Sequence, residues 1–577
     1  MTTSTTTGTG ATSDDRSPVH PSLSEAGRLL CAGTYLDSAY RDRVIEELYV
    51  HEERIVAPSY GFDAARVLAH ALRARRAELG WAAGVVFAWF AGVLLTGGAL
   101  LVVAVPFLLL GIAGWLTSRG RGAVGVLSRV AGALVRLWAW LLLLVLAVAA
   151  LGSGVQVLVF LRPLFWLLDV LGLAPLLYAG GGGLLESWTG LGVLAAFAAV
   201  ATVVGLQRGH VARVILHDLD RNAYARPDTD PAEQAVGVRF ARARERIRHE
   251  QHSRLVMYGF EDPFRGAGLP YRPWHLAVEL RPRSDRAAAE PPELVDNARI
   301  LERIRPRLEG LRLPTPHGSP RAQAAVRDRL RELVVDECVF LPAVGLPGRL
   351  PELFRPEVYE AHRADAVEEG GEQRRHFLRI RVGGWDENLV VTVFVRVHTQ
   401  GRMLMLEVAP HVLLPVDEVF QAADDFALRH RNNNPFAKAV SAVGRTPRSL
   451  GASLATLFGG TASVWRVATA GHRGALPAGP GLSVREIAAQ PDGSLFHLMD
   501  LDRYLKTIQE RVAGGVKETL HEAGWHTDEF DQRLVHVAEG GVFIQSMNHS
   551  AFSVGGSGNS NRTSHHTHTN GSNGSGR

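Results

Sequence analysis

The feature that most constrains this chain is an apolar block that runs from position 81 to position 207. The sequence on both sides is charged and of ordinary composition, and the formal net charge of the whole chain is only +4. Such a profile is typical of a membrane region between soluble parts. We therefore expect an α-helical transmembrane bundle joined to soluble domains.

The first part of the block, from 81 to 115, is too long for one span. As a single helix it would be about 52 Å long at 1.5 Å per residue, whereas the hydrocarbon core of a bilayer is about 30 Å thick. A Thr-Gly-Gly sequence at 96–98 can form a tight turn. This predicts two spans, at about 81–97 and 99–116; the alternative is one tilted span with a kink at Pro106.

Two further spans are predicted at about 137–160 and 189–207, which makes about four in total. Arginines flank the block on both sides, and this places both soluble parts in the cytoplasm and requires an even number of crossings. The stretch 161–188 is interrupted by prolines and glycines, so we expect a re-entrant or interfacial piece there. The predicted location is the inner membrane, with several spans and both termini cytoplasmic.

Two charged residues of that piece, Arg162 and Asp169, are candidate intramembrane polar residues. An ionisable residue at membrane depth suggests function, and Arg162 is the nearest partner in sequence for Asp169. The alternative is that both lie at the level of the lipid headgroups and anchor the loop.

The periodicity of the flanking sequence predicts helices and strands. Tyr40, Val44 and Leu48 recur at helical spacing. Valines alternate with other residues over 391–398, which predicts a half-buried strand of an antiparallel sheet. A narrow apolar stripe predicts a helix at 500–522 that packs on the domain or pairs with a second copy of the chain; its residues are Leu501, Leu505, Ile508, Val512, Val516 and Leu520.

These patterns give a predicted order of segments along the chain. It comprises a disordered start (1–24), cytoplasmic helices (25–80), the membrane domain (81–207), a cytoplasmic α+β domain (208–425), a basic linker or membrane-surface segment (426–485), an amphipathic helix with a short strand (486–552) and a disordered tail (553–577).

The stretch FEDPFRGAGLPYRPW, at 260–274, is the best candidate for a binding loop. It lacks the lysine and the following helix of a phosphate-binding loop. Aromatic residues and arginine are common in binding hot spots. The candidate partner-binding residues are Phe264, Arg265, Tyr271, Arg272 and Trp274. The alternative is that the aromatic side chains pack the loop onto its own sheet.

The segment from 426 to 485 contains no acidic residue and eight arginines or lysines. Apolar and small residues separate these cations, which suits a segment lying on the anionic inner leaflet of a bilayer. The alternative is a flexible basic linker. We expect no nucleic-acid partner, because aromatic residues are sparse here and no nucleic-acid-binding motif surrounds them.

The sequence contains no recognised catalytic or metal-binding motif. The two cysteines are Cys31 and Cys338, far apart and without CxxC spacing. We therefore expect no catalytic, cofactor-binding or metal site and no cofactor.

Two stretches carry a resemblance: DRVIEELYVHEERIVAPSYGFDAARVLAHALRARR before the membrane block and LVMYGFEDPFRGAG after it. They resemble uncharacterised multi-span membrane proteins of actinobacteria with a large cytoplasmic domain. The resemblance extends to about residue 425. It implies location and architecture and brings no activity or site residues.

Three functional hypotheses follow. The first is a non-enzymatic inner-membrane protein that anchors a cytoplasmic module, which binds an unknown protein partner or senses a signal. The second is an oligomeric channel or transporter-like protein, with Asp169 at its mouth. The third is a membrane-tethered enzyme without a recognisable motif.

Overall fold

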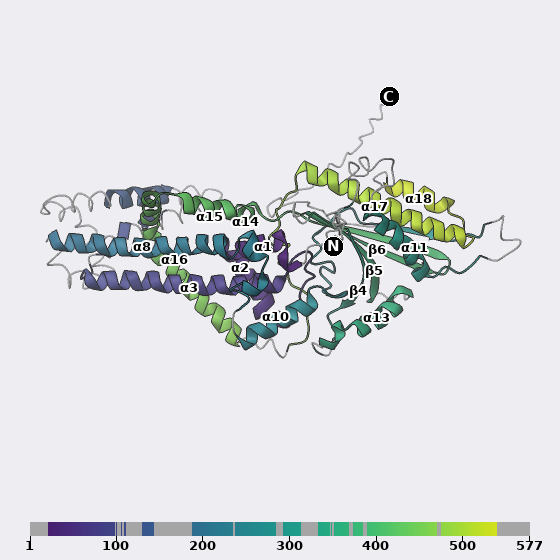
Figure 1. Ribbon diagram of the computed structural model, residues 1–577, viewed down its shortest axis with the longest axis horizontal. Coiled ribbons are helices and arrows are strands. Elements are labelled where there is room, and N and C mark those ends of the chain that lie inside the picture. The colour runs from purple at the N-terminus through teal and green to yellow at the C-terminus, as the bar shows by residue number, and fades with distance from the viewer. Residues whose placement is uncertain are drawn as a thin grey trace, which may run out of the picture.

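The protein is elongated, with a helical part at one end and a sheet covered by helices at the other (Figure 1). The computed structural model describes residues 21–98, 100, 105–106, 109–110, 113, 130–142, 187–234, 237–283, 292–312, 330, 333–346, 348, 351–368, 373–384, 389–469 and 475–538. We call the two ends the helical unit and the sheet unit.

The helical unit begins with three short helical segments, after the 3-10 turn η1 (Pro21–Leu23). They are α1 (Glu25–Leu36), α2 (Ser38–Ile45) and the π-helical turn η2 (Glu46–Val50). Ser24 caps α1 and Asp37 caps α2 through their side-chain oxygens, which satisfy free backbone N–H groups of the first turn. Tyr40, Val44 and Leu48 are buried together, as their spacing predicts.

Helix α3 (Ala64–Leu95) joins a predicted cytoplasmic helix to the first predicted span without a break. The predicted boundary at position 80 therefore falls inside one helix. The helix ends at Leu95, and Gly97 and Gly98 follow with φ of 56° and 91°. Beyond this turn, Leu100 packs back against Gly92. The predicted turn at 96–98 is thus confirmed, and a single helix running through Pro106 is not what forms.

Helix α8 (Ser187–His217) is equally continuous, from the last predicted span into the basic sequence that follows. Within the described residues, two helical stretches are long and apolar enough to cross a membrane, Ala64–Leu95 and Gly192–His217. Only 22 % of the most apolar 18-residue window of each is buried, unlike a core helix of a soluble protein.

The predicted count of four spans is therefore not what the structure provides, which is two candidate spans. The region predicted to span at 137–160 contributes part of a shorter apolar helix, Val130–Leu142, and is otherwise outside the described residues. Most of 99–116 and all of 161–184 also lie outside them.

Segments distant in sequence complete the helical unit. They are α9 (Arg221–Tyr224), η3 (Pro227–Thr229), α10 (Val238–Glu250), α14 (Glu418–Gln421), α15 (Ala423–Asn432) and α16 (Pro435–Thr469). Residues of α1, α3, α8, α10 and α15 share one hydrophobic core. Over 435–469 the basic segment is thus a helix, and Figure 1 shows it crossing α8 and α3.

The sheet unit is built on one curled, seven-stranded sheet in the order β1-β4-β5-β6-β7-β2, with β3 also paired to β7. Its strands are β1 (Leu255–Tyr258), β2 (Leu269–Pro270), β3 (Trp274–Glu279), β4 (Val334–Pro342), β5 (Arg375–Gly384), β6 (Leu389–Gln400) and β7 (Met403–Leu413). The pairs are antiparallel, as predicted, except that β1 and β4 run parallel.

Helices cover one face of this sheet. They are α11 (Asn297–Glu309) with the turn η4 (Gly310–Arg312), α13 (Pro356–Glu368) after the turn η5 (Pro351–Phe354), α17 (Leu495–Glu522) and α18 (Asp528–Ala538). The predicted stripe of α17, from Leu501 to Leu520, is buried against the sheet and α11, so this helix packs on its own domain. The short strand predicted after α17 lies outside the described residues.

The prediction of a half-buried strand at β6 was wrong. Both faces are buried from Leu389 to Val397, including Thr392 and Phe394, which we expected to face solvent. The second face is covered by the loop 259–268 and by Tyr60 of the helical unit. These covering segments are far from β6 in sequence, so the local pattern carries no sign of them.

Candidate functional site

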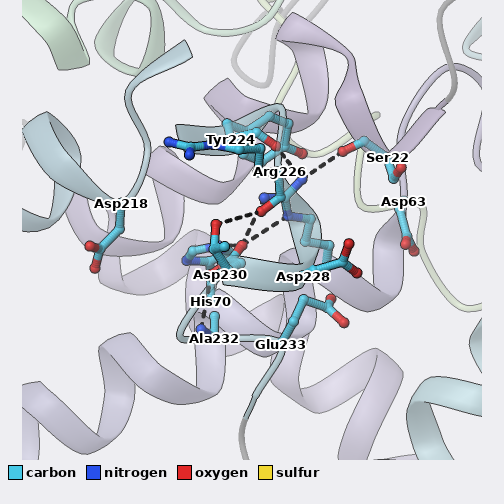
Figure 2. A network of polar contacts seen from close by, with 12 residues as sticks. Ser22, Asp63, His70, Asp218, Tyr224, Arg226, Asp228, Asp230, Ala232 and Glu233 are labelled. Carbon is cyan, nitrogen blue, oxygen red and sulfur yellow. Dashed lines mark hydrogen bonds and ion pairs between the residues drawn. The ribbon is translucent and has the colours of Figure 1, made fainter. Parts of the chain in front are cut away.

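A buried polar network lies where α3 meets the chain that follows α8. Arg66 and His70 are four residues apart on α3, so they project from one face of this helix. Asp230 follows the turn η3, and the backbone N–H of Ala232 donates to its Oδ1 at 2.9 Å. This local turn aims the second carboxylate oxygen at α3 (Figure 2).

Both α3 side chains donate to that same oxygen. Arg66 Nε lies 2.9 Å from Asp230 Oδ2, and His70 Nε2 lies 3.0 Å from it. Arg66 Nη1 donates to the carbonyl oxygens of Ser22 at 2.7 Å and Tyr224 at 2.9 Å, and its guanidinium stacks 3.6 Å from the centroid of the Tyr224 ring. Arg66 and His70 are each 0 % exposed and Asp230 is 3 % exposed.

The environment keeps Asp230 ionised. Burial alone would raise the pKa of its carboxyl group. The hydrogen bond and charge of His70, the N–H of Ala232 and the charge of Arg66 together outweigh burial and hold the pKa well below its usual range. The network is therefore a buried ion pair, in which Arg66 Nη2 lies 2.8 Å from Asp230 Oδ2 without forming a hydrogen bond. Removal of one partner would leave an unpaired buried charge.

Two further ion pairs extend the network to neighbouring elements. Arg73 of α3 pairs with Asp218 at 2.7 Å, just after α8. Arg28 of α1 donates to the carbonyl of Leu219 at 3.0 Å and to both carboxylate oxygens of Asp424 in α15, at 2.9 and 2.8 Å. These contacts thus join the two candidate spans, α3 and α8, to each other and to α1 and α15.

The network also contains a hydrogen-bonded chain, in which His70 and Asp230 are closed to solvent in this conformation. Tyr35 Oη lies 3.2 Å from His70 Nδ1, so a tyrosine, a histidine and an aspartate form a hydrogen-bonded chain that could pass a proton. However, both His70 and Asp230 are buried, and a reacting group needs contact with its substrate. Among the described residues, no group of three or more His, Cys, Asp or Glu side chains could hold a metal ion.

The sheet unit holds a second buried carboxylate with a similar role. Glu337 of β4 contacts His376 at 3.1 Å, Arg305 at 3.2 Å and the Nε of Arg363. Burial opposes ionisation, but the hydrogen bonds and charges of His376 and Arg363 lower the pKa of Glu337 to about 2. Because its charge is balanced by partners from α11, α13 and β5, it joins these elements.

The candidate binding loop does not form a hairpin, because β1 and β3 lie at opposite edges of the sheet. The chain between them crosses the sheet face that the helices leave open. Phe264 lies at the centre of this crossing, with ring centroids 4.8 Å from Phe394, 4.6 Å from His411 and 5.6 Å from Phe377. This side chain packs in the core, as the second interpretation of the loop expects.

The first half of the loop is also fastened to the chain after α16. The backbone N–H groups of Gly266 and Gly268 donate to Glu486 Oε1 at 2.7 and 3.0 Å, and Arg265 donates to the carbonyl of Gly481 at 2.7 Å. Gly268 has φ of 96°, and a Cβ there would lie 2.2 Å from the carbonyl oxygen of Val412. Glycine is therefore required for the loop to lie this close to β7.

The second half of the loop reaches the surface. Tyr271 Oη donates to Asp502 of α17 at 3.0 Å, and Arg272 lies 3.8 Å from the same carboxylate with its side chain 71 % exposed. Trp274 is partly buried against the core between sheet and helices. Of the predicted partner-binding residues, Tyr271 and Arg272 are thus the ones placed together at a surface.

An exposed apolar patch lies beside these two residues. It occupies the first turn and a half of α17, and we call it the α17 patch; its residues are Leu495, Phe496, Leu498 and Met499. Asp502, which binds Tyr271, follows Leu498 and Met499 by one helical turn. Sequence reasoning missed this patch, although four apolar residues ahead of the predicted stripe were a usable sign.

Sequence reasoning also missed the buried network. A usable sign was the presence of Arg66 and His70 four residues apart among apolar residues of one helix, where buried polar groups need partners. Their partner Asp230 is 160 residues from His70 in sequence, and nothing local identifies it. The candidate intramembrane residues Arg162 and Asp169 lie outside the described residues.

Comparison with known proteins gives a match to one family model. Residues 273–550 match the family model of the AbeC-like domain. The match begins just before β3 and continues beyond α18, so it includes most of the sheet unit and also α14, α15 and α16; it leaves out α3, α8 and the residues of the buried network. This part of the chain is therefore similar to an AbeC-like domain. The search found no match among curated proteins or among solved structures.

Proposed function

We propose that this protein is a non-catalytic inner-membrane protein, in which α3 and α8 anchor a cytoplasmic module that binds a protein partner or senses a signal. The observation that carries the proposal is the pair of long apolar helices, which lie side by side (Figure 1). Both carry exposed apolar side chains, among them Phe90 and Leu95 of α3 and Leu194 of α8. The sheet unit, the part of the helical unit outside the spans, and both termini are then cytoplasmic.

The exposed side chains of α3 support a lipid environment. Beyond position 81 the helix presents Phe87, Phe90, Leu94 and Leu95 to its surroundings. In water such a contiguous apolar surface would cost about 25 cal/mol per Å², and soluble monomers seldom expose one of this kind. In a bilayer the same surface is favourably solvated.

Helix α16 supports the same environment, because the polarity of its two faces is the reverse of that in a helix of a soluble protein. Its exposed face carries large apolar residues, whereas the face against α3 and α8 carries small and polar ones. The exposed residues are Phe436, Val440, Val443, Phe458 and Trp465, and the buried ones are Ala442, Thr446 and Ser453. This is the pattern expected for a helix in the interface of the anionic inner leaflet.

The α17 patch is the proposed contact surface for a partner. Phe496 is 74 % exposed, and the patch is bordered by Tyr271, Arg272 and Asp502. Large apolar side chains next to tyrosine and arginine are the composition of protein-binding hot spots. The surface belongs to the sheet unit, which is cytoplasmic in this proposal, so a partner from the cytoplasm can reach it.

The test is capture of a partner by the full-length protein in lipid nanodiscs, from a lysate of its own cells. We expect one protein to be enriched by the wild type and lost with Phe496→Ser plus Met499→Ser. The matched control is Leu294→Ser, since Leu294 is 91 % exposed near the opposite end of α17. Equal recovery with the double variant, or equal loss with the control, would remove the patch from the proposal.

A further inference from the structure

A cavity of about 1010 Å³ lies between α8, α15 and α16. It is separate from the buried network and from the α17 patch, and none of the proposals above uses it. Its position along α8 is informative, because its lining runs from Ala198, in the predicted span, to His217 at the end of the helix.

The part of the cavity nearer the end of α8 is strongly basic. Its lining contains five cationic side chains and one carboxylate, that of Asp425. The cationic residues are Arg208, Arg213, Arg429, Arg431 and Lys438. Three separate helices contribute them, so the fold gathers these charges at one place.

The described contacts of these cations leave their charges unbalanced. Arg208 donates to the hydroxyl of Ser441 at 3.0 Å, Arg213 to the carbonyl of Gly209 at 3.2 Å, and Lys438 to the carbonyl of Arg431 at 3.3 Å. All three acceptors are neutral. The one ion pair, between Arg429 and Asp425, has a separation of 3.8 Å between two exposed side chains, where such pairs contribute little.

The part of the cavity that lies along the predicted span is apolar. Along α8 it is lined by Ala198, Thr202 and Leu206, and on α16 by Val443; Leu206 and Val443 are exposed large apolar residues. From Ala198 to Arg213 the helix rises about 22 Å at 1.5 Å per residue. One end of the cavity is therefore apolar and lies along the predicted span. The other end is cationic and lies at the end of α8 that is predicted to be cytoplasmic.

We propose that this cavity binds an anionic phospholipid of the cytoplasmic leaflet. The headgroup phosphate lies among Arg208, Arg431 and Lys438, and an acyl chain lies along Ala198, Thr202 and Leu206. Basic pockets between helices on the cytoplasmic side are suited to such headgroups. The inference rests on the proposed membrane insertion of α3 and α8. The shared chemistry, a phosphate among arginines, would also suit a soluble phosphate, and the experiment separates the two sources.

The test measures lipid retained by the full-length protein after reconstitution and detergent extraction. Nanodiscs contain equal amounts of phosphatidylglycerol and phosphatidylcholine, and bound lipid is identified by native mass spectrometry. We expect the wild type to retain phosphatidylglycerol in preference to phosphatidylcholine. The variant Arg208→Gln with Lys438→Gln should retain at least fivefold less, and the single variant Arg431→Gln should retain an intermediate amount.

The matched control is Arg76→Gln, an exposed cation on α3 outside the cavity. It removes charge near the same membrane surface, so it should keep wild-type retention if the cavity is a discrete site. Thermal unfolding of every variant checks that loss of lipid is not loss of fold. Unchanged retention by the double variant at intact stability, or an equal decrease in Arg76→Gln, would overturn the proposal.

A separate arm adds inorganic phosphate at millimolar concentration to the protein in detergent. If phosphate alone displaces the retained phosphatidylglycerol and stabilises the protein as much as the lipid does, the site binds a soluble anion and the lipid proposal fails. Flotation with liposomes reports membrane insertion independently. A protein that floats but retains no phosphatidylglycerol contradicts this inference alone, whereas a protein that does not float contradicts the proposed function.

Discussion

The environment of His411 reflects the packing of the loop 259–268 over the sheet. Its ring lies 4.6 Å from that of Phe264, and its Nδ1–H donates to the carbonyl of Ala409 at 3.1 Å. Burial lowers the pKa of this imidazole to about 4, more than the hydrogen bond to Ala409 and the charge of Asp262 raise it. The ring is therefore neutral in the folded protein near pH 6.

This leads to a pH-dependent stability. Between pH 6.5 and about 4 the unfolded chain protonates His411 and the folded chain does not, so the unfolded state binds more protons. Stability falls as pH falls through this window, by roughly 3 kcal/mol in total for a shift of this size. We expect His411→Phe to remove this part of the slope, measured as the free energy of unfolding of the full chain at several pH values.

The exposed residue His275 of β3 provides the control, and His275→Gln should keep the wild-type slope. Glu486, near the same loop, has a raised pKa because of its burial and acts in the opposite direction. Its contribution is common to both proteins and cancels in their comparison. Equal slopes for wild type and His411→Phe would show that the imidazole is not held neutral by the loop.

At the scale of residues, the sequence indicated which loop residues are aromatic or charged, but not which of them are buried and which are exposed. The aromatic and charged residues of 260–274 were identifiable from composition. Whether Phe264 faces solvent depends on Phe377, Phe394 and His411, which come from three strands well beyond the loop in sequence. Such contacts have no local signal, whereas the exposed position of Arg272 agrees with its polar character.

At the scale of elements, the Arg66–His70–Asp230 network joins α3 to the connection after α8. We expect Asp230→Asn to destabilise the protein by about 3–5 kcal/mol, because the guanidinium of Arg66, at 0 % exposure, would lose its charge partner. Thermal or denaturant unfolding of the full chain measures this change.

Asp228 offers the control within the same turn, since its side chain is exposed. Asp228→Asn should change stability by no more than about 0.5 kcal/mol, as is usual for surface substitutions. Comparable losses in both variants would mean that the turn, and not the buried ion pair, joins the two candidate spans.

An element that packs on one face only was predictable from the sequence, whereas a strand covered on its second face by distant segments was not. The stripe of α17 is buried as its helical period requires, because one helix face alone meets the sheet. The alternation in β6 predicts one solvent-facing side, yet Tyr60 and the loop 259–268 cover that side. Likewise, the parallel pairing of β1 with β4 depends on a long connection that no local pattern reveals.

At the scale of the whole molecule, the apolar block identified the region that holds the candidate spans but not their number. Two candidate spans are described instead of four. The helical unit is assembled from segments before, after and far beyond the block, including α15 and α16. Residues of the predicted segments 25–80, 208–425 and 426–485 thus share one hydrophobic core, because tertiary packing brings together parts that are distant in the chain.

The last prediction concerns the orientation of the whole molecule. Cys31 and Cys338 are both free and fully buried, so the native chain should react little with a membrane-impermeant maleimide. Single introduced cysteines can therefore report the side of the membrane. We choose the exposed positions Ser38 in the helical unit, Leu294 in the sheet unit and Leu95 at the far end of α3.

If α3 crosses the bilayer once and both units are cytoplasmic, Ser38→Cys and Leu294→Cys should be labelled in inside-out vesicles and protected in intact spheroplasts. Leu95→Cys should resist labelling from both sides, because the helix rises only about 21 Å between Trp81 and Leu95 at 1.5 Å per residue, which leaves this position inside a hydrocarbon core of about 30 Å. Labelling of Ser38→Cys and Leu294→Cys from opposite sides cannot occur if the two units pack as one body, since Gly266 lies against Pro58 and donates to Glu486 Oε1 at 2.7 Å. That outcome would refute the fold as well as the topology, whereas labelling of all three positions from the cytoplasmic side would refute the span alone.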